Sequence, residues 1–110
     1  MAKIDAFFKL MNEQGASDLH LASGLPPALR IRGDIERIKY KVLDSDDLRA
    51  MLYEIAPEHK VKVFEESGDI DFAYEIPGLA RYRANFFMQR NGVGAVFRAL
   101  LGLEMEVGHR

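Results

Sequence analysis

The sequence contains no cysteine and no threonine among its 110 residues. Without cysteine, neither a disulfide bond nor a thiolate metal site is possible, and a reducing compartment fits this composition. Glycine is never followed directly by lysine. The phosphate-binding loop of P-loop NTPases needs such a pair followed by serine or threonine, so the sequence excludes that loop.

Other active-site motifs are missing as well. None of the four serines lies in the G-x-S-x-G motif of hydrolases, and Gly92 and Gly94 lack the third glycine of a dinucleotide-binding loop. No apolar run approaches the roughly 18 residues of a membrane-spanning helix, and the N-terminus has no apolar signal-peptide segment. We therefore expect no self-sufficient active site and no direct membrane insertion.

The composition is that of one ordinary globular domain. Hydrophobic residues make up 48% and charged residues 29% of the chain, which excludes a disordered or fibrous protein. The net charge of -2 argues against a protein that binds nucleic acid or anionic lipid by bulk attraction.

Hydrophobic periodicity predicts helices and hairpins in a fixed order. Helical spacing covers residues 3–14, 45–55 and 57–67, whereas alternation predicts strands at 17–22, 28–32, 35–38, 69–76, 81–89 and 93–100. Because turns rather than crossover helices connect most strands, we predict an α+β fold with an antiparallel sheet of about six strands flanked by three helices. Residues 1–100 form the domain, and residues 101–110 are predicted to be a tail or the start of an interdomain linker.

Charge is distributed unevenly along the chain. Residues 44–75 contain ten acidic and three basic residues, whereas residues 76–100 contain four arginines and no acid. The last hairpin is therefore predicted to be an electropositive ribbon.

The hairpin sequence predicts which arginines lie together. If Asn91 and Gly92 are the central residues of a type I′ turn, Asn85 lies opposite Arg98 and Arg83 lies opposite Leu100. Arg83, Asn85 and Arg98 then share one face of the sheet, where two guanidinium groups match phosphate oxygens.

The preceding turn separates the arginines by their expected partners. A three-residue loop at 77–79 places Glu75 opposite Arg81 and Ala73 opposite Arg83. Arg81 is then a member of an ion pair on the sheet, while Arg83 and Arg98 have no carboxylate directly opposite and are the better candidates for binding an anion.

Two other groups of residues leave alternatives open. His20 and Asp18 lie on one strand face and could begin a metal site, although a hydrogen-bonded structural pair is the commoner arrangement. The aromatic residues of the last hairpin could stack on nucleic-acid bases, although aromatic residues that alternate in strands usually belong to the core. These aromatic residues are Tyr82, Phe86, Phe87 and Phe97.

Several ordered segments resemble a known family. The matching segments are Gln14-Gly15-Ala16-Ser17-Asp18-Leu19-His20-Leu21, Gly24-Leu25-Pro26-Pro27, Leu29-Arg30-Ile31-Arg32-Gly33-Asp34, Asp69-Ile70-Asp71-Phe72-Ala73-Tyr74, Ala80 to Arg90 and Ala95-Val96-Phe97-Arg98. Over about residues 3–98 they resemble the N-terminal region of type IV pilus retraction (PilT-like) ATPases, within the type II/IV secretion ATPase superfamily.

The resemblance implies a PAS-like domain joined to a RecA-like ATPase domain that carries the Walker motifs. In this family six subunits form a ring, each N-terminal domain packs on its own and a neighbouring ATPase domain, and ATP with Mg²⁺ binds between them. The matching positions Arg83 and Arg98, with Arg81 in a less certain role, would contact the ATP phosphates. The domain alone would bind no cofactor and would not be an enzyme. The expected location is the cytoplasm, at the inner membrane beside the pilus platform protein.

Two departures from the family pattern limit the resemblance. The segment Ala99-Leu100-Leu101-Gly102 lacks the expected Ile-Pro element, and the catalytic domain is absent, so we expect an excised or truncated domain. The equivalent domain of a pilus assembly or type II secretion ATPase stays an alternative. A free-standing PAS-like sensor and a nucleic-acid-binding module are further alternatives from other functional classes.

Overall fold

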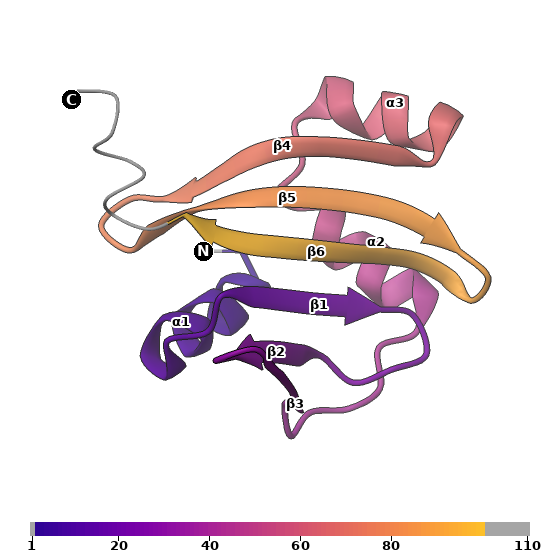
Figure 1. Ribbon diagram of the computed structural model, residues 1–110. Helices are drawn as coiled ribbons and strands as arrows, with labels where there is room; N and C mark the ends of the chain where they lie inside the picture. The colour runs from indigo at the N-terminus through magenta and orange to yellow at the C-terminus, as the bar shows by residue number, and fades with distance from the viewer. Residues whose placement is uncertain (1, 101–110) are drawn as a thin grey trace.

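The computed structural model describes residues 2–100, which form an α+β domain with three helices on one sheet (Figure 1). The predicted tail or linker at residues 101–110 lies outside the described residues. The nine predicted elements are confirmed in order, with ends shifted by one or two residues in most cases. They are α1 (Asp5–Gln14), β1 (Asp18–Ala22), β2 (Ala28–Ile31), β3 (Asp34–Arg37), α2 (Ser45–Tyr53), α3 (Glu58–Ser67), β4 (Asp69–Ile76), β5 (Ala80–Gln89) and β6 (Gly92–Leu100).

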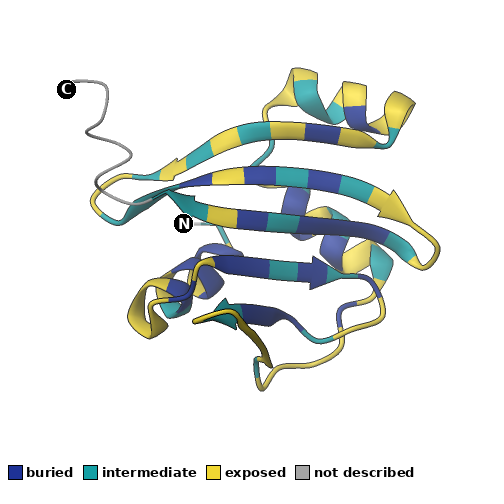
Figure 2. Cartoon of the chain, viewed as in Figure 1, coloured by how far each residue is buried: buried dark blue, intermediate teal, exposed yellow. Residues whose placement is uncertain are grey.

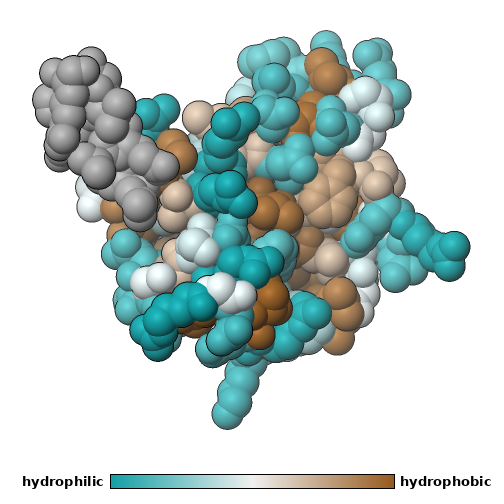
Figure 3. Space-filling view, in the orientation of Figure 1, coloured by the Kyte–Doolittle hydropathy of each residue, from teal (hydrophilic) through white to brown (hydrophobic). Residues whose placement is uncertain are grey.

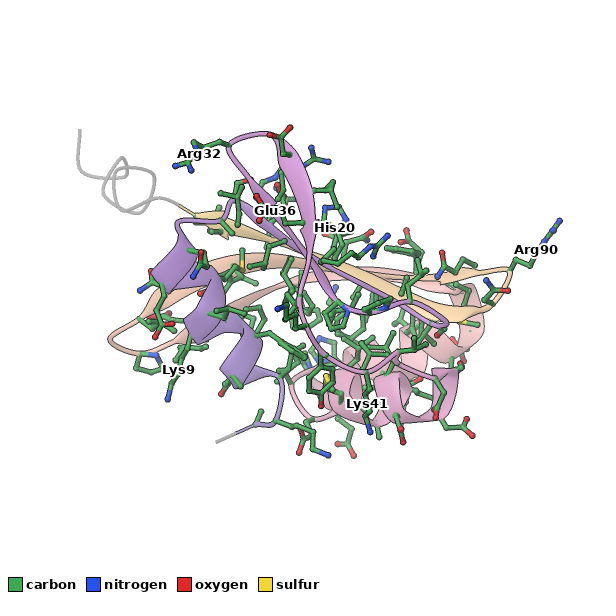
Figure 4. All side chains as sticks on the ribbon, turned by 90° about the horizontal axis from the view of Figure 1, so that it is seen from below. Lys9, His20, Arg32, Glu36, Lys41 and Arg90 are labelled. Carbon is green, nitrogen blue, oxygen red and sulfur yellow. The ribbon has the colours of Figure 1, made fainter. Side chains whose placement is uncertain are left out.

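The six strands form one antiparallel sheet in the order β3-β2-β1-β6-β5-β4. Adjacent hairpins account for most of this order, but β1 pairs with β6 across most of the chain length. The helices all lie on one side of the sheet (Figure 4). Within the described residues, the other side of the sheet therefore has no helix over it, and β3 and β4 form its two edges.

Local sequence signals set the helix ends. The Asp44 carboxylate accepts a hydrogen bond of 2.8 Å from the backbone N–H of Asp47, which caps the start of α2. Helix α1 ends at Gly15, whose φ of 66° is the left-handed conformation that glycine adopts at helix ends.

The hydrophobic core lies between the sheet and the helices. Buried and exposed residues alternate along the strands (Figure 2), so that β1, β5 and β6 each turn one set of side chains toward the helices. Phe8 of α1 is fully buried, and its ring stacks on Tyr82 at 4.4 Å and packs edge-on against Phe97 at 5.0 Å. These rings occupy the space that a ligand of a PAS-like sensor would need on this side.

A polar contact joins α1 to the outer strand. The Tyr74 hydroxyl donates a hydrogen bond of 2.7 Å to Oδ1 of Asp5, whose side chain is otherwise buried. Burial, together with this hydrogen bond, raises the pKa of Tyr74 well above its usual range. The pair satisfies a carboxylate that would be costly to bury alone.

The structure corrects the predicted register of the last hairpin. Gln89 pairs with Gly92, so the connecting residues are Arg90 and Asn91 rather than Asn91 and Gly92. Among residues 2–100 the only non-glycine residue with positive φ is Arg32, so neither connecting residue adopts the type I′ conformation. Gly92 follows the two connecting residues with a φ of 126°, which residues with a side chain rarely adopt, and a Cβ there would also collide with the Ser45 hydroxyl at the start of α2.

Candidate functional site

The uncovered face of the sheet carries the candidate site. Figure 3 looks onto this face, where hydrophobic patches are separated by hydrophilic residues. The corrected register places Arg83 directly opposite Arg98, whereas the predicted partners were Asn85 for Arg98 and Leu100 for Arg83; the observed partner of Asn85 is Val96. Because the correction moves the pairing by two residues, Arg83, Asn85 and Arg98 still share one face, as predicted.

Arg83 and Arg98 belong to a row of four charged residues on neighbouring strands of the sheet. The row runs from Arg30 on β2 through Asp18 on β1 to Arg98 on β6 and Arg83 on β5. Like charges that face each other directly across two strands repel. The two arginines are therefore held together at an energetic cost that neighbouring carboxylates or a bound anion would offset.

Arg98 has a carboxylate partner that the sequence analysis missed. Its Nε donates a hydrogen bond of 3.2 Å to Oδ1 of Asp18, which lies opposite it on β1. The prediction that Arg98 has no carboxylate directly opposite is therefore wrong, because it considered only the hairpin partner strand β5. The Arg98 side chain nevertheless remains 72% exposed, whereas that of Asp18 is 6% exposed.

Arg83 is held more loosely. As predicted, Ala73 lies opposite it on β4, and its nearest carboxylate is that of Asp71, 3.8 Å from Nη2. This distance is too long for a hydrogen bond, and both side chains are more than half exposed. An exposed pair of this kind contributes about 0–1 kcal/mol, so the Arg83 guanidinium is available to another anion.

Arg81 lies at the end of the same face. The predicted pairing with Glu75 is confirmed, and Arg81 Nε lies 3.9 Å from the Glu75 carboxylate. Arg81 Nε is buried and has no hydrogen-bond partner among the described residues. The Arg81 side chain is 43% exposed against 71% for Arg83, so it is less accessible to an external anion.

A shallow depression of about 470 Å³ lies over the arginine pair. Asn85 closes one side, where its amide donates to the Asp69 carboxylate at 3.1 Å and to the Ile70 carbonyl at 2.9 Å. The residues that line the depression are Asp71, Arg83, Ala84, Asn85, Val96 and Arg98. Guanidinium groups on an open surface of this shape can contact the oxygens of a phosphate presented by another domain.

The remaining hypotheses receive no support from the structure. Among residues 2–100, no group of three or more potential ligands could hold a metal ion, so His20 and Asp18 stand alone. Tyr82, Phe86 and Phe97 are buried in the core and cannot stack on bases, whereas Phe87 is partly buried and its ring packs on Gly94. Arg90 projects from the tip of the hairpin, away from the body of the domain (Figure 4). Among residues 2–100, none of the three helices has the length and hydrophobicity of a membrane-spanning segment.

The burial of His20 leads us to expect that the free energy of unfolding depends on pH. Its Nε2 is buried without a hydrogen-bond partner among the described residues, and burial lowers the pKa of His20 more than Asp18 raises it, with Arg30 and Arg37 lowering it further. The folded protein therefore binds this proton more weakly than the unfolded chain does. The free energy of unfolding should be at its full value above pH 6.5 and should decrease as the pH falls below 6.5.

Urea unfolding of the wild type and His20→Gln at pH 7.5 and pH 5.5 checks this expectation. The variant lacks the titrating group, so it should lose less stability than the wild type between the two pH values. Equal losses in both proteins would contradict the assignment, because every other titratable group is common to both.

Two residues of this site lay outside the predicted set. Asp18 was considered as a metal ligand or a structural partner of His20, and Arg30 only as part of a matching segment, yet both belong to the row with Arg98. The alternation of β1 puts Asp18 and His20 on one face, but it does not show which strand lies beside β1. Strand β1 pairs with β6, and this pairing places Asp18 beside Arg98, 80 residues away in the sequence.

The chain is similar to known proteins over most of its length. No protein-family model matches it. It is 48% identical over 88 residues to the type IV pilus retraction ATPase PilT of Pseudomonas aeruginosa, covering 80% of this chain and 26% of that protein. It is 31% identical over 74 residues to a twitching motility protein of Neisseria gonorrhoeae, covering 67% of this chain and 20% of that protein.

A solved structure matches the fold. The crystal structure of the pilus retraction motor PilT with bound ADP matches 93% of this chain and 30% of its own, with a TM-score of 0.82 and 37% identity. The predicted α+β fold with three helices on an antiparallel sheet is thereby confirmed. The chain spans about a quarter of the length of the curated relatives it matches.

Proposed function

Because the chain belongs to the PilT-like secretion ATPases, whose N-terminal domain it matches, we propose that it is the nucleotide-gating domain of a type IV pilus retraction motor. In this proposal a RecA-like ATPase domain follows in the parent protein and binds ATP with Mg²⁺. The domain described here catalyses nothing by itself. Its uncovered sheet face packs against the ATPase domains of its own and an adjacent subunit in a hexameric ring.

One observation carries the proposal. Arg83 and Arg98 face each other on the side of the sheet that no helix covers, and each side chain is more than 70% exposed. The two guanidinium groups would donate to the ATP phosphates, and Arg81 would contribute from the margin of the same face. Bound phosphate would offset the repulsion between the two arginines, so this surface favours an anionic partner.

The proposed mechanism is domain closure that depends on the γ-phosphate. A hydrogen bond to a charged group is worth about 1.5–3 kcal/mol, so two such bonds shift an open–closed equilibrium by roughly 100-fold or more. Hydrolysis removes the γ-phosphate and weakens these bonds, which allows the domain to open. Closure and opening in sequence around the ring would do mechanical work on the platform protein at the cytoplasmic face of the inner membrane.

A comparison of ATP binding and hydrolysis by the isolated chain and by the full-length protein tests whether both need the proposed ATPase domain. The purified 110-residue chain should release no phosphate from ATP, and calorimetric titration should show binding weaker than about 1 mM, since the phosphate-binding loop is supplied elsewhere. The full-length protein should bind in the micromolar range and hydrolyse ATP. ATP hydrolysis by the purified 110-residue chain would refute the proposal.

A further inference from the structure

We infer that Asp18 is a positioning residue that orients the Arg98 guanidinium for the nucleotide phosphates. This inference rests on the proposed function, because it assigns a role in preparing one of the two proposed phosphate-binding arginines. Asp18 itself would not touch the nucleotide.

Both oxygens of the Asp18 carboxylate are engaged inside the domain. Oδ1 accepts the 3.2 Å hydrogen bond from Arg98 Nε, and Oδ2 accepts a 2.8 Å hydrogen bond from the Ser17 hydroxyl. Arg30 Nε lies 3.6 Å from Oδ2. Because the carboxylate is 6% exposed and each oxygen accepts a hydrogen bond, its position on the sheet is well defined.

The contact leaves most of the Arg98 guanidinium free. A guanidinium has five N–H donors, and the one used for Asp18 is Nε–H, which lies nearest the aliphatic stem. No other hydrogen bond joins Arg98 to the described residues through its side chain, and the side chain is 72% exposed. Asp18 therefore fixes the plane of the guanidinium while the Nη1 and Nη2 edge stays available to an anion.

Arg30 supports Asp18 and is not itself a second anion-binding arginine. Its Nη1 donates a 3.0 Å hydrogen bond to the carbonyl of Gly33, while its Nε faces Asp18. This guanidinium is thus engaged on two sides, by Gly33 in the β2–β3 connection and by Asp18 on the neighbouring strand β1. Arg30 offsets the Asp18 charge, so Arg98 retains its attraction for phosphate even though it touches a carboxylate.

The same geometry allows an opposite role, in which Asp18 competes with phosphate for Arg98. The two roles predict opposite results for Asp18→Asn, which keeps the size of the side chain and an acceptor oxygen but removes the charge. If Asp18 positions Arg98, the variant loses activity because the neutral amide holds the guanidinium more weakly. If Asp18 competes, the variant gains activity.

The experiment measures kcat and KM for ATP in the full-length ATPase that carries this domain. The variants are Asp18→Asn, Arg98→Ala and the double variant. Asp18→Asn should lower kcat/KM by about 10-fold, since misplacement of a catalytic group costs this much or more. The double variant should equal Arg98→Ala, because Asp18 has no phosphate-related role once the guanidinium is absent.

Asp34→Asn is the matched control. Asp34 lies on the edge strand β3, is exposed, carries the same charge, and its side chain has no hydrogen bond or ion pair among residues 2–100. This variant should leave kcat/KM within twofold of the wild type. An equal loss in Asp18→Asn and Asp34→Asn would assign the effect to the net charge of the domain and would overturn the inference.

Loss of folding, failure of the inference and failure of the proposed function give different results. If Asp18→Asn unfolds, Ser17→Ala replaces it, since this variant keeps both charges and removes only the donor to Oδ2; it should lower kcat/KM two- to fivefold. If Arg98→Ala lowers kcat/KM while Asp18→Asn, or Ser17→Ala in its place, leaves it unchanged or raises it, the inference fails and the proposed function stands. If Arg98→Ala has no effect, the inference fails; if Arg83→Ala has no effect either, the proposed function fails with it.

Discussion

In the full-length ATPase, Arg83→Ala and Arg98→Ala should each lower kcat for ATP hydrolysis by about 100-fold. Arginines that contact the transferred phosphoryl group contribute factors of about 10³–10⁵ in other phosphoryl-transfer enzymes, and here two side chains share the task. Each truncation also removes a contact that would hold the domains closed around ATP. Steady-state phosphate release, with kcat and KM determined separately, provides the measurement.

Lysine variants and a third arginine sharpen this prediction. Arg83→Lys and Arg98→Lys retain the charge but lose the forked geometry, so they should recover only part of the turnover. Arg90→Ala removes the same charge from the tip of the same hairpin, away from the body of the domain (Figure 4), and should leave turnover unchanged. Wild-type turnover in both alanine variants would refute the assigned role of the two arginines.

Phe8→Ala should lower the free energy of unfolding of the domain by about 3–5 kcal/mol. Truncating a buried phenylalanine removes its transfer free energy and leaves a cavity. Phe8 is fully buried, and its ring contacts Tyr82, Phe97 and Tyr74 with centroid distances of 4.4, 5.0 and 5.5 Å. Because domains have total stabilities of about 5–15 kcal/mol, this variant should be at or near the limit of folding. Equilibrium unfolding in urea measures the change.

The matched control for Phe8 is a phenylalanine on the other side of the sheet. Phe87 lies on the face that carries no helix, where its ring covers Gly94: a Cβ at Gly94 would lie 2.6 Å from that ring. It is only partly buried, so Phe87→Ala should cost less than half as much as Phe8→Ala. Similar losses in the isolated chain would show that the core is not confined to the helix-covered side.

The sequence predicted the elements of this fold because its local signals agree with one another. Ile4, Phe7, Phe8 and Met11 recur at helical spacing, and all four are buried beneath the sheet. The alternation of residues 69–76 likewise matches β4, and the three-residue loop at 77–79 set its register with β5 correctly. Periodicity reports which face an element buries, and here each element buries a single face.

The sequence did not predict the environment of Arg98, and the reason is physical. The pairing of two strands in a hairpin can be predicted from adjacent segments of the sequence. The pairing of β1 with β6 instead depends on closure of a chain segment about 80 residues long. No local pattern encodes that contact. The glycine at position 92 misled the predicted register because it is not a central residue of the turn. Glycine is required there by its φ of 126° just after the connection and by the close approach of Ser45 from α2, which is a tertiary contact.

The edge strand β4 carries acidic side chains that affect contacts between copies of the domain. Asp69, Asp71 and Glu75 alternate along this edge strand and are exposed. Acidic side chains on a sheet margin repel an identical strand, which discourages two molecules from joining into one continuous sheet. Self-association along this margin is therefore disfavoured.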